Sequence, residues 1–176
     1  MEVVISVTLI ALILSTLGMS LLAVQKLRLN NEITSEIQKC GEMIIDYLFT
    51  LPPNDGYIHS VSQNSSDILS LADLVNQNSN DRNRETIIQN LNGILINQAR
   101  SRGFGILRAN NQGNPSRRGA LVLFDHTNPA STSNSRIIVN PQGRNNTVTV
   151  ELYYVWLGAG GRRKGRIIRV SRLFIQ

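Results

Sequence analysis

The chain has 176 residues, of which 41% are hydrophobic, 5% aromatic and 17% charged, with a formal net charge of +6. Its single cysteine, Cys40, excludes an intrachain disulfide and a thiolate cluster for a metal ion. When the first 25 residues are set aside, about 150 remain, which is enough for one compact domain with its own core. We therefore expect one globular head, in residues 52–176.

The net charge conceals a strong asymmetry along the chain. Residues 1–100 hold ten acidic and six basic residues (−4), whereas residues 101–176 hold two acidic and twelve basic residues (+10). A basic surface can face nucleic acid, an anionic surface or an acidic neighbouring subunit. Half of these twelve basic residues gather near the C-terminus, at Arg162, Arg163, Lys164, Arg166, Arg169 and Arg172.

The first segment, residues 1–25, contains an uncharged apolar run. Residues 3–24 hold only Ser, Thr and Gly among the hydrophobic residues, and this run is 22 residues long. As a helix it would measure about 33 Å, against about 30 Å for the hydrocarbon core of a bilayer. It is therefore long enough to cross a membrane or to form the core of an assembly.

The second segment, residues 26–51, is polar but keeps a helical stripe. Apolar residues recur at alternating steps of four and three, and the first proline is Pro52. The pattern predicts one continuous helix of about 50 residues, apolar all round in its first half and amphipathic in its second. We expect the stripe to pack against the head, through Ile33, Ile37, Cys40, Ile44 and Tyr47.

The head is predicted to be α+β, with short helices and an antiparallel sheet. Helical spacing predicts a short helix over residues 67–75 and a longer one over residues 84–102, with Gly103 at its C-terminal end. Polar residues at 147, 149 and 151 alternate with apolar ones, which predicts one wet and one dry strand face. Five strands are expected, in residues 104–109, 120–124, 136–139, 147–157 and 166–175, with GAGGRRKG as a hairpin loop before the last.

No catalytic, metal or cofactor site emerges from the motifs. His59 and His126 lack cysteine or carboxylate partners at metal-ligand spacing, and Asp125-His126 lacks a G-x-S-x-G serine. The glycines of residues 158–161 precede a strand, not a helix, which disfavours a phosphate site. We expect no enzyme activity and no cofactor.

The basic C-terminal strand beside Tyr153, Tyr154 and Trp156 is superficially similar to a nucleic-acid platform. A solvated or subunit-facing basic strand beside core aromatics is the more common arrangement, so no nucleic acid is expected. Two sequons, at Asn64 and Asn145, fall in predicted loops and become N-glycosylation candidates only if the head lies outside the cell.

The apolar run VVISVTLIALILSTLGMSLLAV, continued by an amphipathic helix to Leu51 and followed by a β head, resembles the type IV pilin plan. The version without disulfides is most similar to archaeal type IV pilins. Ile5 stands where processed bacterial pilins usually have Glu, and many archaeal pilins also lack that Glu.

The resemblance implies a structural subunit of an extracellular filament on the cell surface, serving adhesion or surface attachment. It implies membrane insertion before assembly, a type IV pilus assembly machinery and a helical homopolymer. It also implies removal of a short basic leader before Met1. The filament core would then be formed by Val3, Val4, Ile5, Leu9, Ile10, Leu12, Ile13, Leu14, Leu17, Leu21 and Leu22.

A second interpretation takes Met1 as the true start of the chain. Lys26 and Arg28, which follow the apolar run, would then place the head in the cytoplasm by the positive-inside tendency. The chain would be a single-pass membrane protein whose basic head binds nucleic acid or anionic lipid.

Overall fold

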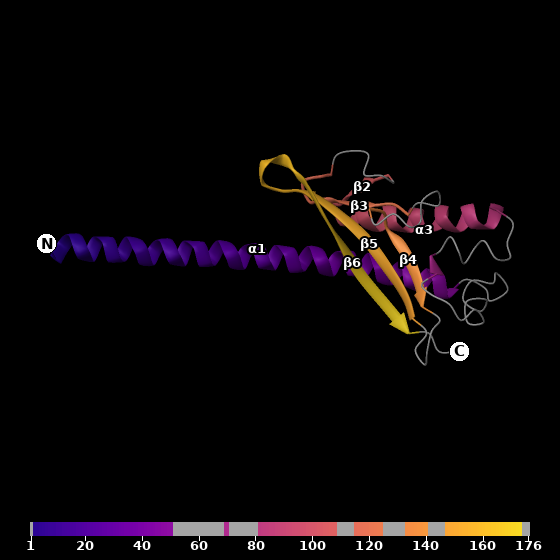
Figure 1. Cartoon of the computed structure of the whole chain (residues 1–176), viewed down its shortest axis with the longest axis horizontal. Helices are drawn as coiled ribbons and strands as arrows, with labels where there is room; N and C mark the ends of the chain where they lie inside the picture. The colour runs from indigo at the N-terminus through magenta and orange to yellow at the C-terminus, as the bar shows by residue number, and fades with distance from the viewer. Residues whose placement is uncertain are drawn as a thin grey trace. The chain divides into compact units, whose positions relative to one another are not determined.

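A computed structural model describes residues 2–50, 69–70, 81–108, 115–124, 133–140 and 147–173. The chain forms two compact units, Met1–Glu36 and Ile37–Gln176, and the boundary between them falls inside the predicted amphipathic segment. Most of the elements are labelled in Figure 1. In chain order they are α1 (Glu2–Thr50), β1 (Leu69–Ser70), α3 (Asp81–Ser101), β2 (Gly105–Leu107), β3 (Ala120–Val122), β4 (Arg136–Asn140), β5 (Thr147–Leu157), the 3-10 turn η4 (Ala159–Gly161) and β6 (Arg163–Leu173).

The long N-terminal helix and the α+β head that follows it are confirmed. Helix α1 has 49 residues and ends at Thr50, close to the predicted end, because Pro52 and Pro53 cannot continue a helix. The Thr50 hydroxyl donates to the carbonyl of Tyr47 at 2.7 Å in the last turn.

Helix α3 confirms the second predicted helix and its terminating glycine. Gly103 has φ 77°, a left-handed conformation that glycine adopts without strain. The N–H groups of Gly103 and Phe104 donate to the carbonyls of Arg100 and Ala99 at 3.0 and 2.9 Å. These bonds form a Schellman motif, which turns the chain directly into β2.

The sheet, as far as the structure describes it, has six strands organised around β5. Strand β4 pairs antiparallel with the first half of β5 and β3 with its second half, while β6 pairs with all eleven of its residues. Strands β4 and β3 therefore share one edge of β5, and β6 occupies the other. Strand β1 extends the sheet beyond β4, and β2 extends it beyond β3.

Four expectations about the head need correction. Leu69 and Ser70, predicted to be helical, form β1 through pairing with Val139 and Ile138, so sheet pairing overrides the local helical pattern; the rest of that predicted helix lies outside the described residues. The sheet is not wholly antiparallel, because β2 and β3 run parallel, joined by the twelve residues 108–119 that such a connection requires.

The other two corrections concern strand boundaries. Strands β2 and β3 have three residues each, and are shorter than predicted. Strand β6 begins at Arg163, three residues early, because Gly160 and Gly161 adopt φ values of 79° and 72° and close the turn within residues 158–162. The Gly158 N–H donates to the carbonyl of Arg162 at 2.8 Å, so Arg163 and Lys164 belong to the strand and not to the loop.

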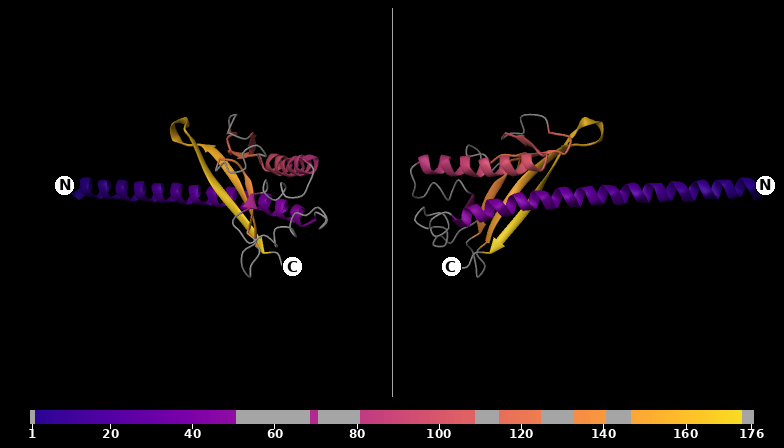
Figure 2. Two further views of the ribbon diagram at one scale, coloured as in Figure 1. Left: turned by 45° about the vertical axis from the view of Figure 1, so that its right-hand side comes forward. Right: turned by 180° about the vertical axis from the view of Figure 1, so that it is seen from behind.

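Both faces of the sheet carry buried side chains. On one face, Leu152 and Val170 approach Gly41 of α1, and Asn90 of α3 donates to the Tyr47 hydroxyl at 3.0 Å, so α1 and α3 cover this face together (Figure 2). The opposite face holds a smaller apolar cluster, with Tyr153 packed against it, formed by Leu107, Ala120, Val122 and Val155.

Side chains close the junction between β4 and β3. The Ser135 hydroxyl donates to the carbonyl of Val122 and accepts the N–H of Tyr153 at 3.1 Å. The Asn92 side chain of α3 pairs with the N–H and the carbonyl of Phe124, at 2.9 and 3.1 Å. Buried backbone groups that no neighbouring strand reaches are thus satisfied by side chains.

Candidate functional site

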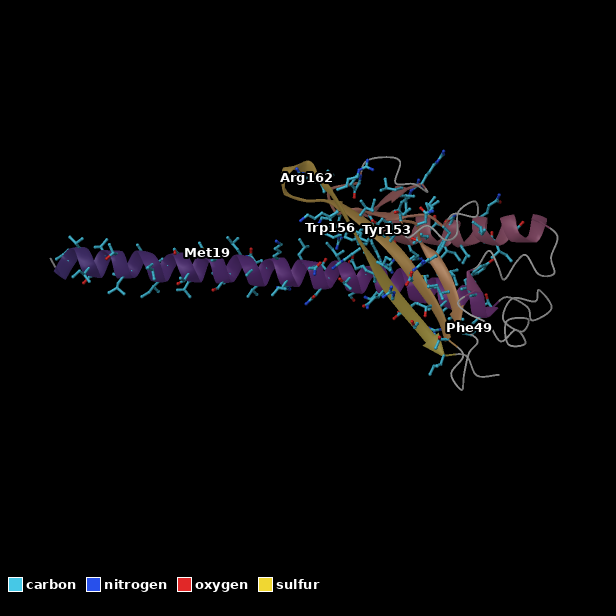
Figure 3. The ribbon with its side chains drawn as sticks, in the orientation of Figure 1. Met19, Phe49, Tyr153, Trp156 and Arg162 are labelled. Atoms are coloured by element: carbon cyan, nitrogen blue, oxygen red, sulfur yellow. The ribbon has the colours of Figure 1, made fainter. Side chains whose placement is uncertain are left out.

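The apolar surface of α1 is the first candidate site. All eleven residues predicted to form a filament core are between 51% and 75% exposed in the single chain. Their side chains project on both sides of the helix around Met19 in Figure 3. By length and composition this segment can cross a membrane, a criterion that a signal sequence near the N-terminus also meets. The packing of these residues against one another in a filament stays a prediction.

Hydroxyl groups interrupt this apolar surface but bond to the helix itself. The Thr8 hydroxyl donates to the carbonyls of Val4 and Ile5 at 3.0 and 2.8 Å. The hydroxyls of Thr16 and Ser20 donate to the carbonyls of Ile13 and Thr16 at 2.8 and 2.9 Å. Because these donors are satisfied within α1, the segment tolerates an apolar environment.

The second candidate site is the part of α1 that packs in the head. Ile37, Cys40 and Ile44 are fully buried, whereas Ile33 and Tyr47 are half-buried. The structure also buries Ile45 and Leu48, which the stripe did not include. Their spacing from Ile37 and Ile44 is helical, so a wider stripe would have found them.

A salt bridge connects the acidic part of α1 to the basic strand β6. Arg172 pairs with Asp46, and its guanidinium carbon lies 5.9 Å from the ring centroid of Phe49. An acidic residue of this helix segment therefore meets the basic strand within one chain. Both side chains are substantially exposed, so the pair guides register more than it adds stability.

Glu151 is buried at the centre of the sheet, which corrects its predicted place on a wet strand face. It is 2% exposed and pairs with Arg136 from β4 and Arg169 from β6. Burial alone would raise the pKa of Glu151, but hydrogen bonds and charge from the two arginines outweigh it, so the pKa is lowered. The strand pattern could not reveal this cluster, because it depends on the register of three strands.

The aromatic residues of β5 form a row with arginines at its ends. Tyr154 and Trp156 stack with ring centroids 5.4 Å apart, and Arg166 lies 5.6 and 5.9 Å from the two rings. Phe104 meets Tyr154 edge-on at 6.0 Å, and Arg118 lies 5.5 Å from the Phe104 ring.

Tyr154 belongs to the core and not to an open stacking platform. Its side chain is buried, and its hydroxyl donates to the carbonyl of Arg118 at 2.7 Å. Burial raises the pKa of this hydroxyl, although the charges of Arg166 and Arg118 oppose the shift. A ring held in this way has little free face for a nucleotide base.

The β5–β6 hairpin ends in an exposed basic tip. Arg162, Arg163 and Lys164 are exposed, and Leu157 beside them is 51% exposed. Lys164 lies opposite Trp156 in the register of the two strands.

His59, Asn64, Asp125, His126 and Asn145 lie outside the described residues. Among the residues that the structure describes, no group of three or more His, Cys, Asp or Glu side chains could hold a metal ion. Comparison of the chain with protein families, with curated proteins and with solved structures finds no match.

Proposed function

We propose that the chain is the structural subunit of an extracellular, type IV pilin-like filament that serves adhesion or surface attachment. One observation carries the proposal: a single helix, α1, is exposed and apolar through its first half and buried in a folded head at its C-terminal end. The first half needs an apolar environment that the head does not supply.

The size of the apolar surface supports an assembly. Soluble monomers rarely expose contiguous apolar patches larger than a few hundred Å², whereas α1 exposes its whole circumference over residues 3–24. Removing each such side chain from water contributes roughly 1.5–3 kcal/mol. Lipid would cover the surface before assembly, and neighbouring copies of α1 would cover it afterwards.

Contacts between identical subunits that repeat with a rise along the axis give an open filament, because the rotation does not close. The bundled α1 segments would form its core and the heads its outer surface. The assembly machinery is implied by the resemblance to type IV pilins.

The experiment is to shear intact cells, pellet the released material, image it by electron microscopy and identify its protein and N-terminal residue by mass spectrometry. We expect filaments composed of this chain. If the chain stays with the membrane and no filament contains it, the proposal is wrong.

The exposed basic tip favours a second candidate function, a single-pass membrane protein whose head binds nucleic acid or anionic lipid. A tight complex of the chain with DNA or RNA, weakened steeply by salt, would support it against the filament.

A further inference from the structure

We propose that the tip of the β5–β6 hairpin, residues 157–164, docks on anionic headgroups of the bilayer that holds the apolar segment of α1. The inference rests on membrane insertion, which both candidate functions include, and does not require a filament. It assigns a partner to a basic surface of the described part of the head.

The composition of the tip fits an anionic interface. Arg162, Arg163 and Lys164 are exposed, and Glu151 is the last acidic residue of the chain. Leu157 lies opposite Arg163 in the register of the two strands and is 51% exposed. At a membrane surface, basic side chains contact phosphate groups while an adjacent apolar side chain enters the boundary with the acyl chains.

The conformation of the tip is well defined by its glycines. A Cβ built on Gly158 would lie 2.9 Å from Cε of Lys164, so the lysine stem lies against the turn. Gly160 and Gly161 supply the left-handed residues that close it. Arg162 therefore directly follows a compact turn, and Arg163 and Lys164 are the first residues of β6 beside it.

The hairpin points toward the end of the head where the chain enters. Asp46 of α1 contacts Arg172 of β6, and Gly41, which precedes Asp46 in the helix, lies next to Val170. Moving along α1 toward its N-terminus therefore corresponds to moving along β6 toward the tip of the hairpin. Figure 3 shows Arg162 and Phe49 at opposite ends of the hairpin.

The lengths of strand and helix give the reach of the tip within the head. The eight residues from Val170 to Arg162 span about 26 Å of strand, whereas the four from Gly41 to Ile37 span about 6 Å of helix. The tip thus extends past Ile37, the first residue of the second unit. In the sequence, residues 25–36 separate Ile37 from the apolar run, and they include the basic residues Lys26 and Arg28.

Trp156 supplies an intrinsic probe, because it is the only tryptophan of the chain and lies opposite Lys164. The full chain would be reconstituted in nanodiscs of phosphatidylcholine, with or without phosphatidylglycerol, containing a lipid spin-labelled at its headgroup. We expect stronger quenching of Trp156 with phosphatidylglycerol, and loss of the difference at high salt.

The variant Arg162→Glu with Lys164→Glu tests the tip directly. Each cation near an anionic surface changes the equilibrium by about fivefold, so the ratio of docked to undocked heads should fall about 25-fold or more. The matched control is Arg82→Glu with Arg84→Glu in the first turn of α3, which makes the same change in net charge. We expect the control to keep the quenching of the wild type.

Three results would overturn the inference: equal quenching in the two lipid compositions, an equal loss in the control pair, or release of quenching by a DNA oligonucleotide at physiological salt. The salt titration of the wild type needs no variant, so a misfolded variant does not decide the outcome. If filaments form but the tip does not dock on the bilayer, only this inference is wrong. If the tip docks but no filament contains the chain, only the proposed filament is wrong.

Discussion

At the scale of single residues, Glu151 connects three strands. Its carboxylate bonds to Arg136 and Arg169, which reach it from opposite sides of β5. A buried carboxylate is tolerated here because two guanidinium groups offset its loss of hydration.

Replacing this carboxylate, as in Glu151→Gln, should destabilise the head. Removing one partner of a buried charge pair lowers the free energy of unfolding by about 3–5 kcal/mol. Because the Arg169 side chain is 65% exposed and stays hydrated, we expect a smaller loss here, of about 2 kcal/mol. Thermal unfolding of the full chain in detergent measures the change. Glu42→Gln, at an exposed carboxylate of α1, is the matched control and should have little effect.

The stability difference between wild type and Glu151→Gln should depend on pH. The pKa of Glu151 is lowered in the folded chain from its ordinary value of 4.5. The ion pair therefore contributes fully above that ordinary value, and its contribution is lost as the pH falls through the folded-state pKa. The difference in melting temperature between wild type and Glu151→Gln should close only in acid below 4.5. A difference that is constant down to strong acid would contradict this assignment.

At the scale of elements, the contact between α1 and β6 depends on a glycine. A Cβ built on Gly41 would lie 2.7 Å from Cγ2 of Val170, whereas one built on Gly93 of α3 meets nothing within 4 Å. The two helical glycines therefore form a natural comparison.

We expect Gly41→Ala and Gly93→Ala to have opposite effects on stability. Alanine improves helix propensity by about 1 kcal/mol, but overpacking at Gly41 costs roughly 1–3 kcal/mol. Gly41→Ala should thus lower the melting temperature and Gly93→Ala raise it. Val170→Ala should rescue Gly41→Ala, and a stabilising Gly41→Ala would show that α1 does not pack closely on β6.

The elements also show what the sequence could predict. Helices α1 and α3 and most of β5 and β6 were predictable, because hydrophobic periodicity and glycine or proline boundaries are local signals. Strand β1 was not, because Leu69 and Ser70 become a strand only by pairing with β4, far along the chain. The Glu151 cluster was missed for the same reason, since register is a property of paired strands.

At the scale of the whole molecule, the apolar segment of α1 and the folded head have different requirements. Substitutions within the segment would separate anchoring in a membrane from the proposed assembly into a filament. In a bilayer, fluid lipid chains fill the space left when leucine is replaced by alanine. In a packed protein core the same replacement leaves a cavity and lowers stability by about 2–5 kcal/mol.

Leu12→Ala combined with Leu21→Ala should therefore reduce the number of filaments while leaving the amount of membrane-bound chain nearly unchanged. Leu27→Ala with Leu29→Ala is the control pair, because both leucines are exposed but lie beyond the predicted core. Counting sheared filaments by electron microscopy and quantifying the membrane fraction would test this. An equal loss of filaments from both pairs would move the core boundary beyond residue 25.

The arrangement of α1 on β6 has a mechanical consequence. A pull applied at Ile37 along the helix axis acts on a segment that is held first by Gly41 against Val170 and then by Asp46 on Arg172. Beneath these contacts, β6 is bonded to β5 along eleven residues. The load is shared along the helix and the strand instead of falling on one contact, which would suit a subunit under tension in the proposed filament.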